Sequence, residues 1–136
     1  MSFAELEHTA DVRMEVRAPT LGELFSEAAR ALMHVMYGAP GAGRDMVFPL
    51  ALEEEEIVPL MHAFLSEVLF ISEVESVVIT AARVEVQGGR LEGDLVGERY
   101  SPERHCCGQE VKGISLSGLD IVRDEGSYRL TVIFDV

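Results

Sequence analysis

Two segments of the chain repeat apolar residues at helical spacing, so each must form a helix with one face to bury. The first begins at Thr20, where Thr20 and Glu23 have the spacing of a capping box, and ends at Gly38. The second follows the acidic run 53–56 and has Pro59 near its first turn. The apolar positions are Leu21, Leu24, Phe25, Ala28, Ala29, Leu32 and Met36 in the first helix, and Ile57, Leu60, Met61, Phe64, Leu65, Val68 and Leu69 in the second.

Other segments alternate apolar and polar residues with a period of two, which is typical of strands with one solvent-exposed face. They cover residues 12–18, 78–86, 91–95 and 128–134. Gly88 and Gly89 predict a tight hairpin between the middle two, and residues 124–127 predict another before the last. These elements predict an α+β fold: a two-layer domain with a largely antiparallel sheet and two amphipathic helices on one face.

The size and net charge of the chain limit the classes of function that it can have. A chain of 136 residues and 15.0 kDa fits one domain over residues 1–136. The net charge of −13 repels a phosphate backbone, which argues against direct nucleic-acid binding. No apolar run reaches the roughly 18 residues needed to cross a bilayer, and the N-terminus lacks the pattern of a signal peptide. We therefore expect a cytoplasmic protein with no membrane partner.

Oxygen-bearing anions occur near both ends of the chain. Residues 7–11, which include His8 and Asp11, enter the first strand and can bind a cation, act as an acid or base, or cap a turn. At the other end, Asp135 stands beside the terminal carboxylate of Val136. If the fold brings Asp11 to that point, the three anions suit a hard divalent ion such as Ca²⁺, Mg²⁺ or Mn²⁺ rather than zinc. The alternative is that Asp135 and the terminus are simply solvated at a sheet edge.

Three further positions carry polar groups of interest. Lys112 is the only lysine, and alternation places it on the sheet face of Ile114 and Leu116; a specific need for an ammonium and chance retention both account for it. Glu98 ends a strand and is either a second acid near the site or an ordinary loop acid. The segment 105–107, His-Cys-Cys, can bind a soft metal or react with an oxidant, but its adjacent cysteines favour a reduced loop pair.

Taken together, these segments resemble the archease family, whose members are accessory proteins of RNA ligases of the RtcB type. The resemblance runs along the whole chain and rests on Phe3, residues 7–12, residues 20–25 with Ala28 and Ala29, residues 64–70, Gly97 and Glu98, residues 110–112, and the final pair Asp135 and Val136. It departs after Lys112, where the family usually continues with Ala, Thr, an aromatic residue and His, and this chain has Gly113 to Ser117. A role of that histidine therefore does not transfer.

The resemblance implies an α+β fold and a divalent metal bound by Asp11, Asp135 and Val136. It also implies an activator, not an enzyme, which promotes guanylylation of a ligase that uses GTP and Mn²⁺, and so permits repeated turnover in tRNA splicing and RNA repair. On this hypothesis the three anions, with Lys112 and with His8 and Glu98 nearby, are presented to the ligase active site. The acidic surface would favour a basic enzyme over its RNA.

Two other functions stay open at this stage. The carboxylates could hold a metal that activates water, which would make the protein a metal-dependent phosphoester hydrolase. They could equally form a purely structural metal site, which predicts a metal-dependent melting temperature and no effect on a ligase. The sequence contains no phosphate-cradling loop, nucleophile elbow or Ser-His-Asp spacing, which argues against the enzyme.

Overall fold

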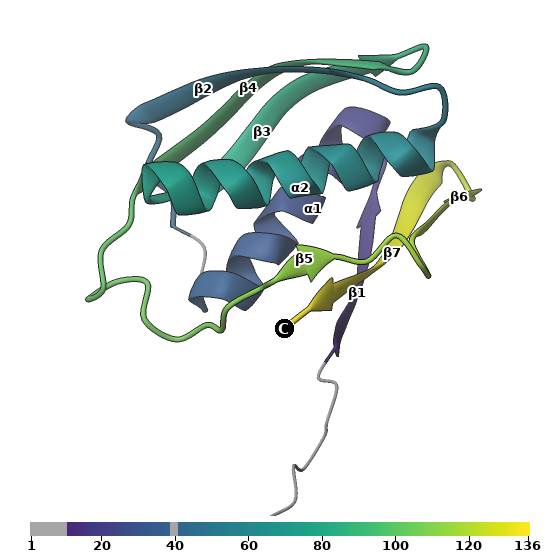
Figure 1. Cartoon of the computed structure of the whole chain (residues 1–136). Coiled ribbons are helices and arrows are strands. Elements are labelled where there is room, and N and C mark those ends of the chain that lie inside the picture. The colour runs from purple at the N-terminus through teal and green to yellow at the C-terminus, as the bar shows by residue number, and fades with distance from the viewer. Residues whose placement is uncertain (1–10, 39–40) are drawn as a thin grey trace, which may run out of the picture.

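The computed structural model describes residues 11–38 and 41–136, in which seven strands and two helices follow one another along the chain (Figure 1). They are β1 (Asp11–Ala18), α1 (Leu21–Tyr37), β2 (Met46–Glu53), α2 (Ile57–Glu75), β3 (Val77–Gln87), β4 (Arg90–Arg99), β5 (Gly113–Ile114), β6 (Asp120–Asp124) and β7 (Ser127–Asp135). The predicted cap of α1 is present: the Thr20 hydroxyl accepts from the Glu23 amide at 3.2 Å, and Gly38 ends the helix with a positive φ.

The strands form two antiparallel sheets where the sequence predicted one. In the first sheet β7 pairs with β1, and also with β5 and β6 toward its two ends. In the second sheet β4 lies between β2 and β3. Both predicted hairpins are present, at Gly88 and Gly89 and at the β6–β7 turn. The sequence did not predict β2, because the strand contains Pro49, which lacks an amide donor. The proline is tolerated because β2 lies at the edge of its sheet.

Both helices lie between the two sheets and contact strands of each (Figure 1). α1 packs on β3 from one side and on β1 and β7 from the other, whereas α2 packs on β2, β3 and β4 and on β5 and β6. Their predicted apolar faces form the core, and at its centre the rings of Phe25 and Phe64 meet edge to face at 5.1 Å. The α+β class, with antiparallel strands and two helices, is confirmed.

The sequence predicted no segment apolar enough over about 18 residues to cross a bilayer, but one helix of the described ranges, α2, meets that criterion by length and composition. A core helix of a globular domain has the same length and composition. In this fold the apolar stripe of α2 packs between the sheets, and Leu60, Phe64 and Val68 are fully buried.

Candidate functional site

The two ends of the described chain meet at one end of the sheet built on β7. Asp135 lies directly opposite Asp11 of β1 and, on its other side, opposite Gly113 of β5. The side chains of directly paired residues in an antiparallel ladder share one face, with Cβ atoms about 4.5–5.5 Å apart. Asp11 and Asp135 therefore project together. Both are exposed, because the fully buried Phe134 takes the opposite face.

Backbone contacts hold this end of β7 in place. The Lys112 amide donates to the Asp135 carbonyl at 2.7 Å. His62 of α2 donates from Nε2 to the Ile114 carbonyl at 2.9 Å, which ties β5 to the helix beneath it. Val136, which follows Asp135 in the chain, is half-buried and packs against the core.

The donor chemistry of this end suits a hard cation, since carboxylate oxygens are the ligands that Ca²⁺, Mg²⁺ and Mn²⁺ prefer. No group of three or more His, Cys, Asp or Glu side chains within residues 11–38 and 41–136 is placed to hold a metal ion. A cation held by Asp11 and Asp135 would require at least one further donor. His8 lies outside the described residues.

The expected apolar row around Lys112 is not formed. β5 is only two residues long, so the alternation that would join Lys112 to Ile114 and Leu116 does not extend over them. Ile114 is buried, whereas Lys112 and Leu116 are exposed. Lys112 therefore contributes an exposed side chain next to the residue paired with Asp135, not a cation rising from an apolar surface.

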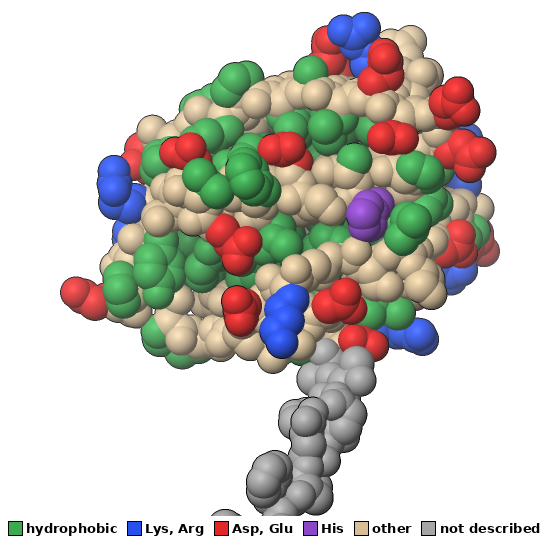
Figure 2. All heavy atoms as spheres, viewed as in Figure 1, with side chains coloured by type: hydrophobic (Ala, Val, Ile, Leu, Met, Phe, Trp, Pro, Cys, Tyr) green, Lys and Arg blue, Asp and Glu red, His purple; other side chains and the backbone are tan. Residues whose placement is uncertain are grey.

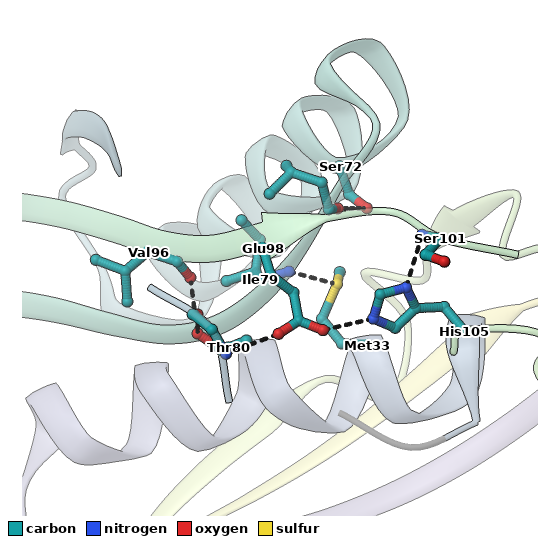
Figure 3. Close-up of polar contacts among 10 residues, drawn as sticks. Met33, Ser72, Ile79, Thr80, Val96, Glu98, Ser101 and His105 are labelled. Atoms are coloured by element: carbon teal, nitrogen blue, oxygen red, sulfur yellow. Dashed lines mark hydrogen bonds and ion pairs between the residues drawn. The ribbon is translucent and has the colours of Figure 1, made fainter. Parts of the chain in front are cut away.

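Glu98 belongs to the other sheet and its carboxylate has other partners (Figure 3). It is buried, accepts from the Gly43 amide at Oε1 over 2.7 Å, and bonds His105 Nε2 at Oε2 over 2.6 Å. Thr80 adds a bond from its hydroxyl to the Gly43 carbonyl at 2.7 Å. Glu98 thus joins the segment before β2 to the loop after β4, and it is not grouped with Asp11 and Asp135.

The proton positions of this buried pair follow from the geometry. The Ser101 amide donates to His105 Nδ1 at 2.9 Å, so that nitrogen carries no proton and Nε2–H donates to Glu98 (Figure 3). Burial raises the pKa of Glu98, but hydrogen bonds from His105 and Gly43 and the charge of Arg104 outweigh it, so the pKa lies below its ordinary value. Glu98 is therefore an ionised structural acceptor.

A cavity of about 320 Å³ opens beside this pair. Tyr37, Tyr100 and His105 line it, with ring centroids 5.6 to 6.1 Å apart. Ser72 also lines it: its hydroxyl donates to the Val77 carbonyl at 2.7 Å and therefore accepts from the Tyr37 hydroxyl at 2.7 Å. Burial raises the pKa of Tyr37, so the phenol stays neutral.

Sequence reasoning missed this cavity, although it named the segment 105–107 as a possible site and Met36 and residues 110–111 for other reasons. One signal was available: Ser72 continues the apolar stripe of α2 after Leu65, Val68 and Leu69, and a polar residue on a buried face needs a partner. Cys106 and Cys107 are free and exposed, with sulfur atoms 2.8 Å apart. This agrees with the prediction of a reduced pair in a loop.

Comparison with known proteins agrees with this architecture. The archease protein family matches residues 3–136. The chain belongs to the archease family. An archease of Methanopyrus kandleri is 28% identical over 140 residues, covering all of both chains, and one of Pyrococcus furiosus is 29% identical over 96% of this chain and 95% of its own.

Two solved structures share the fold. Protein 1598 of Methanobacterium thermoautotrophicum superposes with a TM-score of 0.73 at 27% identity over 96% of each chain. An archease of Thermotoga maritima, described as a possible chaperone, has a TM-score of 0.67 at 20% identity over 100% of this chain and 98% of its own. Family membership supports an accessory role for the chain.

Proposed function

We propose that the protein activates an RNA ligase of the RtcB type in the cytoplasm, by promoting guanylylation of the ligase with GTP and so permitting repeated turnover in tRNA splicing and RNA repair. The observation that carries the proposal is the pairing of Asp11 with Asp135 across β1 and β7, in a member of the archease family. It groups the carboxylates that the family resemblance assigns to a metal, at an exposed end of the domain where a partner can reach them.

The metal site of this proposal consists of Asp11, Asp135 and the carboxylate of Val136, with His8 and Lys112 as neighbouring candidates for partner contact. An all-oxygen donor set favours Ca²⁺ in the isolated protein, with Mg²⁺ or Mn²⁺ as alternatives. An ion bound there would neutralise the carboxylates of Asp11 and Asp135, which the pairing of β1 with β7 places opposite each other. The net charge of −13 directs the domain toward a basic protein and away from RNA.

The decisive assay compares ligation in single-turnover and multiple-turnover conditions, with and without the protein, at constant ligase concentration. We expect stimulation of multiple turnover and faster formation of the ligase–guanylate intermediate. Absence of stimulation at every ratio of protein to ligase would rule out the activator. RNA alone should not bind the protein at physiological ionic strength.

Carboxylate variants test the site itself. Asp11→Asn and Asp135→Asn should each abolish stimulation, whereas Asp124→Asn, an exposed aspartate at the far end of the same sheet, should not. A metal at about 100 times its Kd adds about 2.7 kcal/mol of stability. Ca²⁺ should therefore raise Tm by several degrees in the wild type and in Asp124→Asn, but in neither site variant. A short peptide added after Val136 should remove the same shift.

A further inference from the structure

The cavity beside Glu98 and His105 has walls of two kinds, aromatic and acidic. Tyr37 and Tyr100 supply ring surfaces, with the buried ring of His105 stacked against Tyr100, and the exposed residues Glu73 and Glu110 also line the cavity. Among the described residues that line it there is no Lys or Arg. We infer that this cavity receives an arginine side chain of the partner protein. The inference rests on the proposed function only in that the partner is the ligase.

Aromatic faces attract a planar cation. The face of an aromatic ring carries negative potential, and a guanidinium within about 6 Å of its centroid is attracted to it and can stack on it. Tyr100 is the accessible ring, with 37% of its surface exposed. It stacks on the buried ring of His105 at 5.8 Å and 29° and tilts against Tyr37 at 5.6 Å, so both rings support its position. A cavity of about 320 Å³ has room for one such side chain.

Charge selects the cation over the other ligands that stack on aromatic rings. A nucleotide would also stack, but its phosphates would meet Glu73 and Glu110 in a protein of net charge −13. A neutral apolar group would leave the two carboxylates unused. A guanidinium offers five N–H donors in a planar fork, which suits carboxylate acceptors beside a ring face.

The wall is held rigid before any partner arrives. The Tyr100 amide donates to the Ser76 carbonyl at 2.8 Å, which ties the end of β4 to the end of α2. His105 is fixed at both ring nitrogens by Ser101 and Glu98 (Figure 3). Tyr37 is fixed through its hydroxyl by Ser72. These side chains therefore lose little conformational entropy on binding. Preorganisation of this kind lowers the entropic cost of binding.

The surface next to the cavity adds apolar contact area. Phe70 and Val74 stand one helical turn apart on α2 and are each 59% exposed; Phe70 precedes Glu73 by three residues, so it shares a helix face with that carboxylate. Figure 2 shows hydrophobic side chains interleaved with Asp and Glu on the face that α2 presents. This surface therefore fits a partner segment that places a basic side chain in the cavity and apolar residues next to it.

Titration of the isolated protein with small probes tests the cavity directly. N-acetyl-arginine amide should shift the amide NMR signals of Tyr100, Glu110 and Val111, whereas the citrulline analogue, which has the same shape without the charge, should not. The double variant Glu73→Gln/Glu110→Gln should weaken binding roughly 5-fold, and Tyr100→Ala roughly 2- to 5-fold. Glu75→Gln, an exposed change on the same helix outside the cavity, is the matched control.

The ligase assay supplies the second readout. The Glu73→Gln/Glu110→Gln variant should raise the concentration for half-maximal stimulation at least 5-fold and leave the maximal rate unchanged, whereas changes at Asp11 or Asp135 should lower the maximal rate. Equal shifts with arginine and citrulline, or cavity shifts caused by guanosine monophosphate, would overturn the inference. Failure of the wild type to stimulate the ligase refutes the proposed function instead, and the arginine titration then decides the inference alone.

Discussion

Replacing Glu98 with glutamine removes one acceptor from a buried pair of hydrogen bonds while keeping the size of the side chain. The carboxylate accepts from the Gly43 amide and from His105 Nε2. Because His105 Nδ1 is occupied by the Ser101 amide, the histidine cannot change tautomer to suit a new partner. A glutamine has one oxygen for two donors, so its NH₂ group must face an N–H.

The cost can be estimated from these contacts. A hydrogen bond to a charged group contributes about 1.5–3 kcal/mol, and a buried donor left without a partner costs about 1–3 kcal/mol. The two costs are not additive, because the lost hydrogen bond and the donor left without a partner are two views of the same interaction. We expect Glu98→Gln to lower the free energy of unfolding by roughly 2–4 kcal/mol, which is a drop in Tm of about 10 °C for a domain of this size.

Urea or thermal denaturation at pH 7 measures this change. The matched control is Glu92→Gln on the same strand, where the carboxylate is exposed and pairs with Arg90 at 2.6 Å; it should alter stability by less than about 0.5 kcal/mol. A Glu98→Gln protein as stable as the Glu92→Gln control would refute the reasoning, because Glu98 would then be an ordinary loop acid.

The pH dependence gives an independent check with a definite sign. The pKa of Glu98 is lowered below 4.5 in the folded protein, so the unfolded chain binds its proton more readily than the folded one. The stabilisation by Glu98 is therefore complete above about pH 4.5 and is lost as pH falls through the folded pKa. The stability difference between wild type and Glu98→Gln should shrink on acidification; a constant difference would contradict an ionised Glu98.

Three further changes test the core and the cavity wall by thermal denaturation, with the circular dichroism spectrum as a check of the native fold. Ser72→Ala removes the bridge between Tyr37 and Val77 and should cost about 1–3 kcal/mol; no loss would mean that water replaces the hydroxyl. Phe64→Ala should cost about 3–5 kcal/mol, because the side chain is fully buried, and a loss under 1 kcal/mol would contradict its central place. Gly108→Ala should destabilise the loop after β4, since a Cβ there would collide with the Met36 carbonyl; a neutral change would show that the loop is not docked on α1.

Local patterns in the sequence determined most of the secondary structure. Helical spacing of apolar residues and the cap at Thr20 predicted α1, and the apolar stripe from Ile57 predicted α2. These signals are readable because they depend on neighbours within one or two helical turns or strand pairs. Gly88 and Gly89 likewise predicted a hairpin, since both adopt positive φ values that favour glycine.

Only the tertiary structure decided which strands share a sheet and which polar groups meet. Asp11 and Asp135 stand far apart in the sequence, and the β1–β7 register places them opposite each other. Glu98 and His105 were separate loop candidates until burial made each the partner of the other. Strand pairing and burial depend on contacts between distant segments, and short-range periodicity carries no information about them.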